Sequence, residues 1–356
     1  FRLPPHADGT LPLSLDVPAK GKCFVNICYH CKQDSALIKA DHLLGFDEIP
    51  LQNSDPRNQD AVQLLGRPAG DGLITIRETD RMLVLSCEQF TYVFNKLTGL
   101  FDKMTFANEP LLDQPMGFNV WRAPTDNDRK LKADWYAAHY DHAATNAYHT
   151  EYTVTASGVT LHTHVGIAAI CVQKFLDLDV TWTVANNGSV DLALHAQRNT
   201  VFPELPRFGL RLFLPQEMSQ VNYYGMGPME CYCDKHHAAS HNSYTATVWQ
   251  LHEDYIRPQE NGSHFDCDYV MLAGDAVRLT AVGTQPFSFN ASHYTQEELT
   301  RKAHNYELEP CSSTVLCLDY AQNGIGSESC GPRLLEQYRL DDATFNFGLR
   351  LFPEKK

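Results

Sequence analysis

Residues 73–99 read LITIRETDRMLVLSCEQFTYVFNKLTG and indicate the fold class of this chain. Within them, 73–77, 82–87 and 90–94 are short runs of mainly branched and aromatic residues, which favour strands. Short polar turns separate the runs, and Lys-Leu-Thr-Gly at 96–99 has the composition of a hairpin turn. This pattern predicts adjacent antiparallel strands.

Similar strand signals recur along the rest of the chain. They fall at 22–29, 42–49, 152–155, 159–164, 176–184, 190–195, 210–214, 269–272, 277–282, 314–320 and 344–352. The best helical periodicity is at 132–140 and 296–304. Many short strands separated by turns predict an all-β protein of packed antiparallel sheets, rather than a parallel α/β sheet.

Length and composition limit the classes of protein to consider. The chain has 356 residues, enough for two or three domains, and residues 52–72 are polar and turn-rich, as in a linker. A formal charge of −14 disfavours nucleic acid as a partner. No apolar window approaches the ~18 residues of a membrane span, so we expect no membrane association. Eleven cysteines without zinc-ribbon spacing favour reduced thiols and a cytoplasmic location.

Common cofactor and nucleophile motifs do not occur in the sequence, which has no phosphate-binding loop, no GxSxG and no HExxH. His236, His237 and His241 lie near Cys231, Cys233 and Asp234 and could form a metal site with them. Adjacent histidines on a strand point to opposite faces, however. We therefore expect no metal in this chain.

The stretch WRAPTDND at 121–128 could carry acid–base chemistry. It places Asp126 and Asp128 two residues apart, close to Arg122. Turn formation and an ion pair with the arginine explain these residue types without catalysis. We therefore expect a structural role for both carboxylates.

The loop 255–264 brings Arg257, Glu260 and His264 close together in sequence, a set suited to hydrogen bonding with hydroxyl groups. Hydrolysis of a glycoside needs two carboxyl groups about 5–10 Å apart. The sequence alone does not place a second carboxylate near Glu260.

The stretch GIGSESCGP at 324–332 predicts a constrained loop, because three glycines and a proline lie within nine residues. Cys330 has no neighbouring His or Lys to activate its thiol, so we do not expect it to be a nucleophile. Loops of this kind commonly shape a surface that contacts something else.

Six stretches, taken in order, resemble one family. They are FNKLTG at 94–99, WRAPTDND at 121–128, LPRFG at 205–209, YGMGPME at 224–230, RPQENG at 257–262 and GIGS at 324–327. The set resembles the C-terminal third of the large bacterial β-galactosidases of glycoside hydrolase family 2. In members split into two polypeptides, this region is the separate small chain. Residues 11–51 are similar to the second half of the immunoglobulin-like domain before it.

The resemblance implies a partial immunoglobulin-like β-sandwich over residues 1–55, a linker over 56–72 and a galactose-mutarotase-like β-supersandwich over 73–356. The remaining strands of the sandwich would lie outside this chain. We therefore expect an exposed apolar face around Phe24, Ile27 and Leu44, where those strands or a partner would dock.

The resemblance also implies an activity that this chain would not perform alone. The family's catalytic glutamates, its Mg²⁺ and its monovalent cation belong to a (β/α)₈ barrel, so we expect no catalytic residue and no cofactor here. The chain would be the non-catalytic part of a retaining β-galactosidase acting on β-galactosides such as lactose. Its partners would be the catalytic-barrel portion or large chain of the same enzyme, in a homo- or hetero-oligomer.

Five residues are the expected substrate contacts on one wall of the sugar site. They are Cys330, Ser329, Arg257, Glu260 and His264. Some family members carry a Trp near the position of Cys330, and a cysteine cannot stack on a sugar ring as a Trp does. We therefore expect altered binding of glucose or of an acceptor sugar.

Two other functions stay open at this point. One is a stand-alone carbohydrate-binding module that uses Arg257, Glu260 and His264. The other is a mutarotase-like epimerase, with Glu260 as the base and His264 as the acid.

Overall fold

The computed structural model describes residues 3–356 and divides the chain into two units, with the division between Gln63 and Leu64. Unit 1 contains the strands β1 (Cys23–His30) and β2 (Leu43–Leu51), and the helix α1 (Gln59–Leu65) includes the division. A helix therefore occupies part of the segment that the sequence predicts to be a linker. It begins after Asn58, whose side-chain oxygen accepts the Ala61 backbone N–H at 3.0 Å.

The two strands of unit 1 form an antiparallel pair. Phe24 pairs with Pro50 and Ile27 with Asp47, so Phe24 and Ile27 point to opposite faces of the pair. Ile27 and Leu44 have 37% and 59% of their surface exposed, whereas Phe24 is half-buried. Apolar exposure is thus confirmed at Ile27 and Leu44, but the prediction that all three residues share one face is wrong.

Unit 2 is built from antiparallel strands, as the sequence predicts. The strands are β3 (Thr75–Glu78), β4 (Met82–Ser86), β5 (Phe90–Asn95), β6 (Leu100–Phe106), β7 (Glu109–Pro110), β8 (Gln114–Asn119), β9 (Ala144–Thr155), β10 (Gly158–Ala168), β11 (Leu176–Ala185), β12 (Val190–Arg198), β13 (Arg207–Pro215), β14 (Gln220–Gly227), β15 (Ser240–Thr247), β16 (Ser263–Ala273), β17 (Val277–Ser292), β18 (Ser313–Gln322) and β19 (Thr344–Lys355). The helices are α2 (Leu131–Ala137) and α3 (Gln296–Arg301), with short 3₁₀ turns η1 (Asn127–Arg129), η2 (Tyr140–His142), η3 (Val248–Leu251), η4 (Asn305–Glu307) and η5 (Glu336–Tyr338).

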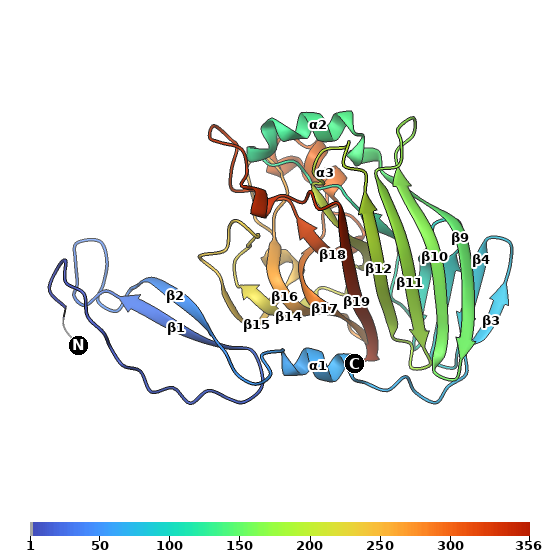
Figure 1. Cartoon of the computed structure of the whole chain (residues 1–356), viewed down its shortest axis with the longest axis horizontal. Helices are drawn as coiled ribbons and strands as arrows, with labels where there is room; N and C mark the ends of the chain where they lie inside the picture. Colours follow the sequence, from blue (N-terminus) through green and yellow to red (C-terminus); the bar gives the residue numbers. More distant parts are fainter. Residues whose placement is uncertain (1–2) are drawn as a thin grey trace. The chain divides into compact units, whose positions relative to one another are not determined.

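The strands of unit 2 form two sheets (Figure 1). The larger sheet has the order β15-β14-β16-β17-β19-β12-β11-β10-β9, with β13, β18 and β8 attached to it through β17. The smaller sheet has the order β3-β4-β5-β6-β7. The long strand β17 pairs with β19 through residues 277–283 and with β18 through residues 288–292, so it joins the two parts of the larger sheet.

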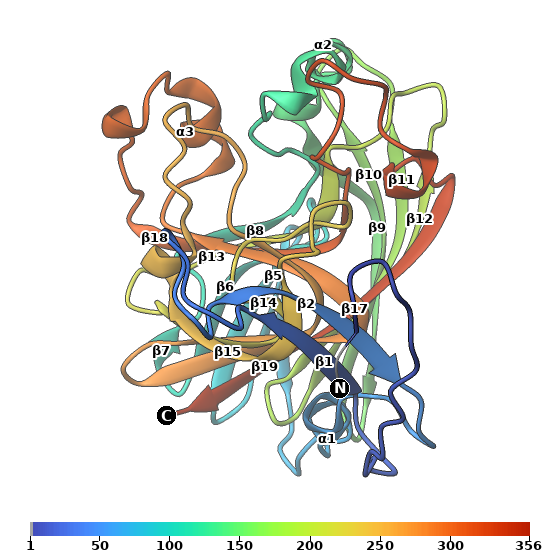
Figure 2. The ribbon, with the colours of Figure 1, turned by 90° about the vertical axis from the view of Figure 1, so that its left-hand side faces the viewer.

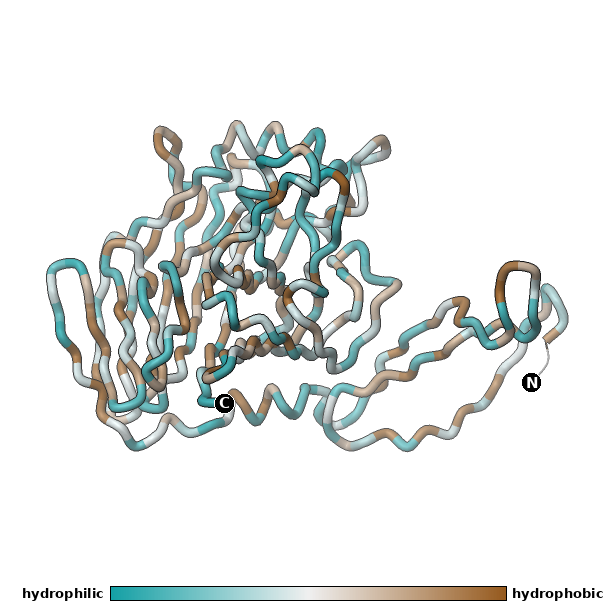
Figure 3. The backbone as a smooth tube through the Cα atoms, turned by 180° about the vertical axis from the view of Figure 1, so that it is seen from behind, coloured by the Kyte–Doolittle hydropathy of each residue, from teal (hydrophilic) through white to brown (hydrophobic). Residues whose placement is uncertain are grey.

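The core of unit 2 lies where the smaller sheet packs on the larger one. Buried residues, most of them apolar, alternate with half-buried or exposed ones along β10, β11 and β12. Figure 3 shows hydrophobic and hydrophilic residues alternating along strands of unit 2. Phe101 on β6 packs edge-to-face on Trp182 of β11, with ring centroids 5.3 Å apart. Trp182 also donates its indole N–H to the carbonyl of Gly99 at 3.0 Å, which joins the turn of the smaller sheet to the core.

Helices and loops gather at one end of unit 2. In Figures 1 and 2, α2, α3 and the loop between β18 and β19 lie together at that end. Both helices fall where the sequence predicts them, at 132–140 and 296–304. In the part of the chain that the structure describes, no helix has the length and apolar character needed to cross a membrane.

Candidate functional site

Hydrogen bonds join five of the six family-like stretches, although they lie far apart in sequence. We call these five stretches the motif cluster; they are 121–128, 205–209, 224–230, 257–262 and 324–327. Its interior is ionic rather than apolar, with two arginines that have no exposed surface, Arg122 and Arg207. Burial of a charge is costly unless it is paired, so their partners determine what the cluster can do.

Arg122 is neutralised by Asp128 from the same stretch. Its Nε lies 3.3 Å from Asp128 Oδ2 and its Nη2 lies 2.5 Å from Asp128 Oδ1. The same carboxylate accepts the backbone N–H of Thr125 at 2.8 Å and its hydroxyl at 3.1 Å. The structural role expected for Asp128 is confirmed. Arg122 also donates to the carbonyls of Asn323 and Gly324, which ties this turn to the loop before β19.

Arg207 is the centre of the second buried network. It donates from Nη1 to Glu260 Oε1 at 2.7 Å, from Nε to Asp319 Oδ1 at 3.1 Å and from Nη2 to Asn290 Oδ1 at 2.9 Å. Glu260 is only 2% exposed, and its second oxygen accepts the backbone N–H of Ala123 at 3.2 Å. The Glu260 carboxylate is thus used inside the protein, which corrects the expectation that it contacts sugar.

The charges in this network influence one another. Burial raises the pKa of Asp319 to about 6, while the adjacent Arg207 opposes that rise. Burial alone would lower the pKa of Arg207, but the carboxylates of Asp319 and Glu260 raise it well above its ordinary value. Arg207 therefore stays charged between its two acidic partners.

Glu230 connects the 224–230 stretch to the 257–262 stretch. Its carboxylate accepts the backbone N–H of Gly262 at 2.9 Å, the ammonium group of Lys235 at 2.7 Å and the hydroxyl of Tyr255. Burial favours a higher pKa for Glu230, but the hydrogen bonds from Lys235, Tyr255 and Gly262 lower its pKa below the ordinary value. Glu230 is therefore an ionised structural acceptor.

His264 lies in the interior rather than on a sugar-facing surface. It is 1% exposed, its Nδ1 lies 3.1 Å from the hydroxyl of Tyr223, and its ring stacks on Phe289 with centroids 5.1 Å apart. Burial lowers the pKa of His264 to about 4, so the ring is neutral near pH 7. The prediction that His264 contacts sugar is therefore wrong. A neutral, buried ring also removes support for an epimerase in which His264 is the acid.

Cys330, Ser329 and Arg257 lie nearer the surface, where their contact with sugar stays a prediction. Cys330 is exposed and Ser329 is half-buried, with its carbonyl accepting a hydrogen bond from Arg129. The Arg257 side chain is 67% exposed, and its Nη1 lies 3.7 Å from Asp126 Oδ1. The five predicted substrate contacts therefore do not share one exposed surface.

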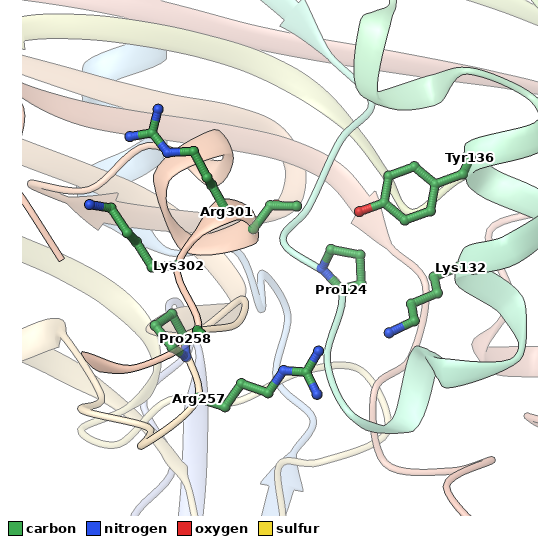
Figure 4. Close-up of a pocket in the computed structure, with 9 residues that line it drawn as sticks. Pro124, Lys132, Tyr136, Arg257, Pro258, Arg301 and Lys302 are labelled. Carbon is green, nitrogen blue, oxygen red and sulfur yellow. The ribbon is translucent and has the colours of Figure 1, made fainter. Parts of the chain in front are cut away.

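A hollow of about 360 Å³ lies beside the motif cluster (Figure 4). Its lining consists of Pro124, Lys132, Tyr136, Arg257, Pro258, Thr300, Arg301, Lys302 and Ala303. Arg301 and Lys302 both form ion pairs with Glu298, and their charged ends point away from Arg257 and Lys132 in Figure 4. Three of the four cationic side chains at the hollow, Arg257, Arg301 and Lys302, are thus already paired with a carboxylate.

In the histidine- and cysteine-rich segment near residue 236, the histidine side chains contact one another or a carboxylate. His241 Nε2 lies 2.8 Å from Asp266 Oδ2, and the rings of His236 and His237 lie 5.0 Å apart. Within residues 3–356, no group of three or more His, Cys, Asp or Glu side chains is arranged to hold a metal ion.

The roles of three residues that organise this end of unit 2 are not predicted from the sequence. Arg207 belongs to a recognised stretch without an assigned role, and Asp234 accepts two backbone N–H groups of the 324–327 stretch. Asp319 carries a signal that could have identified it, because it is a charged residue inside the apolar run VLCLDY of β18.

The fold and the motif cluster define an all-β protein in which buried ion pairs join loops that lie far apart in sequence. Comparison with known proteins places it more narrowly. The family model "Beta galactosidase small chain" matches residues 86–351. The chain is 37% identical to a β-galactosidase of Actinobacillus pleuropneumoniae over 99% of this chain and 34% of that protein. It is 34% identical to a β-galactosidase of Staphylococcus xylosus over 98% of this chain and 34% of that protein.

The chain belongs to the β-galactosidase small-chain family, as its resemblance implies. It spans about a third of the length of these two relatives. Among solved structures, it is similar to a galactose mutarotase-like protein from Lactobacillus casei, with a TM-score of 0.42 and 9% identity over 77% of this chain and 100% of that chain. A galactose 1-epimerase from Lactobacillus acidophilus matches with a TM-score of 0.43 and 8% identity over 80% of this chain and 98% of that chain.

Proposed function

We propose that this chain is the non-catalytic C-terminal part of a retaining β-galactosidase of glycoside hydrolase family 2. In this role it supplies scaffold, contacts with the catalytic-barrel portion and one wall of a site for β-galactosides such as lactose. The names of the relatives support the activity, and the third of their length that this chain spans supports the need for a partner portion.

The observation that carries the non-catalytic role is the use of the cluster's carboxylates in internal bonds. Glycoside hydrolysis needs one carboxyl group to donate a proton and a second to attack or activate water, both facing the sugar. Asp128 and Glu260 are instead buried against Arg122 and Arg207, and Glu230 is bonded to Lys235. None of these three carboxylates is free for either task.

The Mg²⁺ and the monovalent cation of the proposed enzyme would be held by the catalytic-barrel portion. No group of three or more His, Cys, Asp or Glu side chains suited to a metal is present in the described part of this chain. We further propose a cytoplasmic location, which the eleven unpaired cysteines support.

The test is hydrolysis of a nitrophenyl β-galactoside by this chain alone, by the barrel-containing portion of the Actinobacillus relative alone, and by their mixture. We expect the mixture to hydrolyse the galactoside and each separate portion to be inactive. Activity of the isolated chain would refute the non-catalytic role. A mixture that forms a complex yet stays inactive would refute the proposal that this chain completes a β-galactosidase.

A further inference from the structure

The loop between β18 and β19 begins with two backbone N–H groups that point at a single carboxylate. Ile325 N donates to Asp234 Oδ1 at 3.0 Å, and Gly326 N donates to Asp234 Oδ2 at 2.7 Å. Hydrogen bonds to a charged acceptor are shorter and stronger than those between neutral groups. Asp234 therefore fixes two successive peptide groups at the start of the loop.

The same carboxylate explains the glycines of the Gly-Ile-Gly sequence. A Cβ atom added at Gly324 would lie 2.6 Å from Asp234 Oδ2, closer than a carbon and an oxygen can pack. A Cβ atom added at Gly326 would lie 3.1 Å from the same oxygen. The absence of side chains at these positions lets the loop backbone approach the carboxylate.

Asp234 is itself held independently of the loop. It lies in a tight turn in which Tyr232 N donates to Lys235 O at 2.9 Å and Lys235 N donates to Tyr232 O at 3.0 Å. Tyr232 is 2% exposed, and the preceding Cys231 N donates to Ser263 O at 2.7 Å. A carboxylate on a turn that is fixed to the sheet can set the position of a more exposed segment.

Other side chains also hold the 324–330 segment. Asn127 donates its side-chain N–H to Ile325 O at 2.5 Å, next to the Asp234 contacts. Further on, the Arg129 guanidinium donates to the Ser329 carbonyl. Ser329 and Cys330 follow Gly326 by three and four residues in the same segment.

We propose that Asp234 is a positioning residue for the 324–330 segment, and that it thereby sets how tightly the enzyme binds its galactoside. This inference rests on the proposed function, because it assumes that Ser329 and Cys330 form part of the sugar site. Asp234 does not take part in the chemical step. Loss of the Asp234 carboxylate weakens the contact between the 324–330 segment and the galactoside. Because that contact is made equally in the ground state and in the transition state, KM rises and kcat stays nearly unchanged.

The experiment compares Asp234→Ala, Asp234→Asn and a control, Asp254→Asn, each mixed with the barrel-containing portion. Asp254 is exposed, and its side chain accepts a hydrogen bond from Asn305 at 3.0 Å rather than from the 324–330 segment. We expect KM for a nitrophenyl β-galactoside to rise roughly tenfold in Asp234→Ala, with kcat within about threefold of the unmodified protein. Asp234→Asn keeps one acceptor oxygen, so its KM should rise by only about threefold. The control should match the unmodified protein.

A second measurement uses the chain alone and needs no activity. Amide hydrogen exchange at Ile325 and Gly326 should become roughly tenfold faster in Asp234→Ala, while amides of β10 and β11 keep their protection. Faster exchange throughout β10 and β11 would show a general loss of folding and overturn the positioning role.

The outcomes separate this inference from the proposed function. If the unmodified mixture is active and Asp234→Ala has a KM within about twofold of it, the inference is wrong. If the unmodified mixture is inactive, the proposed function fails and the binding role of Asp234 fails with it. In that case, unchanged exchange at Ile325 and Gly326 would refute the anchoring of the loop as well.

Discussion

Replacing Arg207 by Met tests the buried ionic network directly. Methionine fills much of the space of the arginine but donates no hydrogen bond. The change removes the partner of two carboxylates, Glu260 and Asp319, and a donor to Asn290, all of them buried. Removal of one member of a buried ion pair typically costs about 3–5 kcal/mol, because the remaining charge is left without compensation. We expect the free energy of unfolding to fall by about 4 kcal/mol.

The loss of unfolding free energy in Arg207→Met should depend on pH, and the structure determines whether the loss grows or shrinks as pH rises. Burial already raises the pKa of Asp319 to about 6, above the ordinary value of 3.8, and Arg207 opposes that rise. Without Arg207 the pKa rises further, so the native state binds more protons than the unfolded state between the two pKa values. Stability then falls as pH rises through this range. The cost of Arg207→Met should therefore be larger at about pH 8 than at about pH 5.

Urea denaturation followed by circular dichroism at both pH values measures the effect. Arg301→Met is the matched control, because the Arg301 side chain is 72% exposed and pairs with Glu298 at the surface. It should cost less than about 1 kcal/mol. A loss below about 1 kcal/mol for Arg207→Met, or a cost that grows as pH falls, would contradict the assigned network.

Three further changes test other parts of unit 2. His264→Asn should flatten the pH dependence of the melting temperature: the folded pKa of His264 is lowered to about 4 by burial, so the unmodified protein loses stability as pH falls below about 6.5. An equal slope of melting temperature against pH in the unmodified protein and in His264→Asn would contradict this. Gly209→Ala should lower the free energy of unfolding by about 2–3 kcal/mol, since its Cβ would lie 2.3 Å from Leu318 O; a neutral result in urea denaturation would show that β13 can move away from β18. Trp182→Phe should cost about 1–3 kcal/mol, because it loses packing volume and the hydrogen bond to Gly99; an unchanged urea midpoint would contradict that contact.

Strands with one buried face could be predicted from sequence, and polar edge strands could not. The predicted runs 159–164, 176–184 and 190–195 lie within β10, β11 and β12, where apolar side chains alternate toward the core. β15 has the sequence SHNSYTAT and lies at the end of the larger sheet. Its side chains carry no apolar alternation, so its pairing with β14 stabilises a strand that its own pattern does not predict.

The motif cluster could be predicted as separate polar loops but not as one network. Arg122 and Asn323 are joined by a hydrogen bond although they are 201 residues apart, and no local pattern signals such a contact. Polarity also does not show whether a side chain faces water or an internal partner. For this reason Glu260 and His264 are expected at the surface from sequence, and both are buried in the structure.

The bonds in the cluster limit how this chain can influence catalysis in the proposed enzyme. A carboxylate that neutralises a fully buried arginine, as Asp128 and Glu260 do, cannot also protonate a glycosidic oxygen without leaving that arginine uncompensated. Changes at these carboxylates should therefore reduce stability and activity together. Changes at Cys330, which is exposed and has no part in the buried ion pairs, should alter sugar binding without altering stability. Comparison of Cys330→Trp with Glu260→Gln, by KM and by urea denaturation, separates these two kinds of influence. Equal losses of stability in the two variants would contradict the distinction.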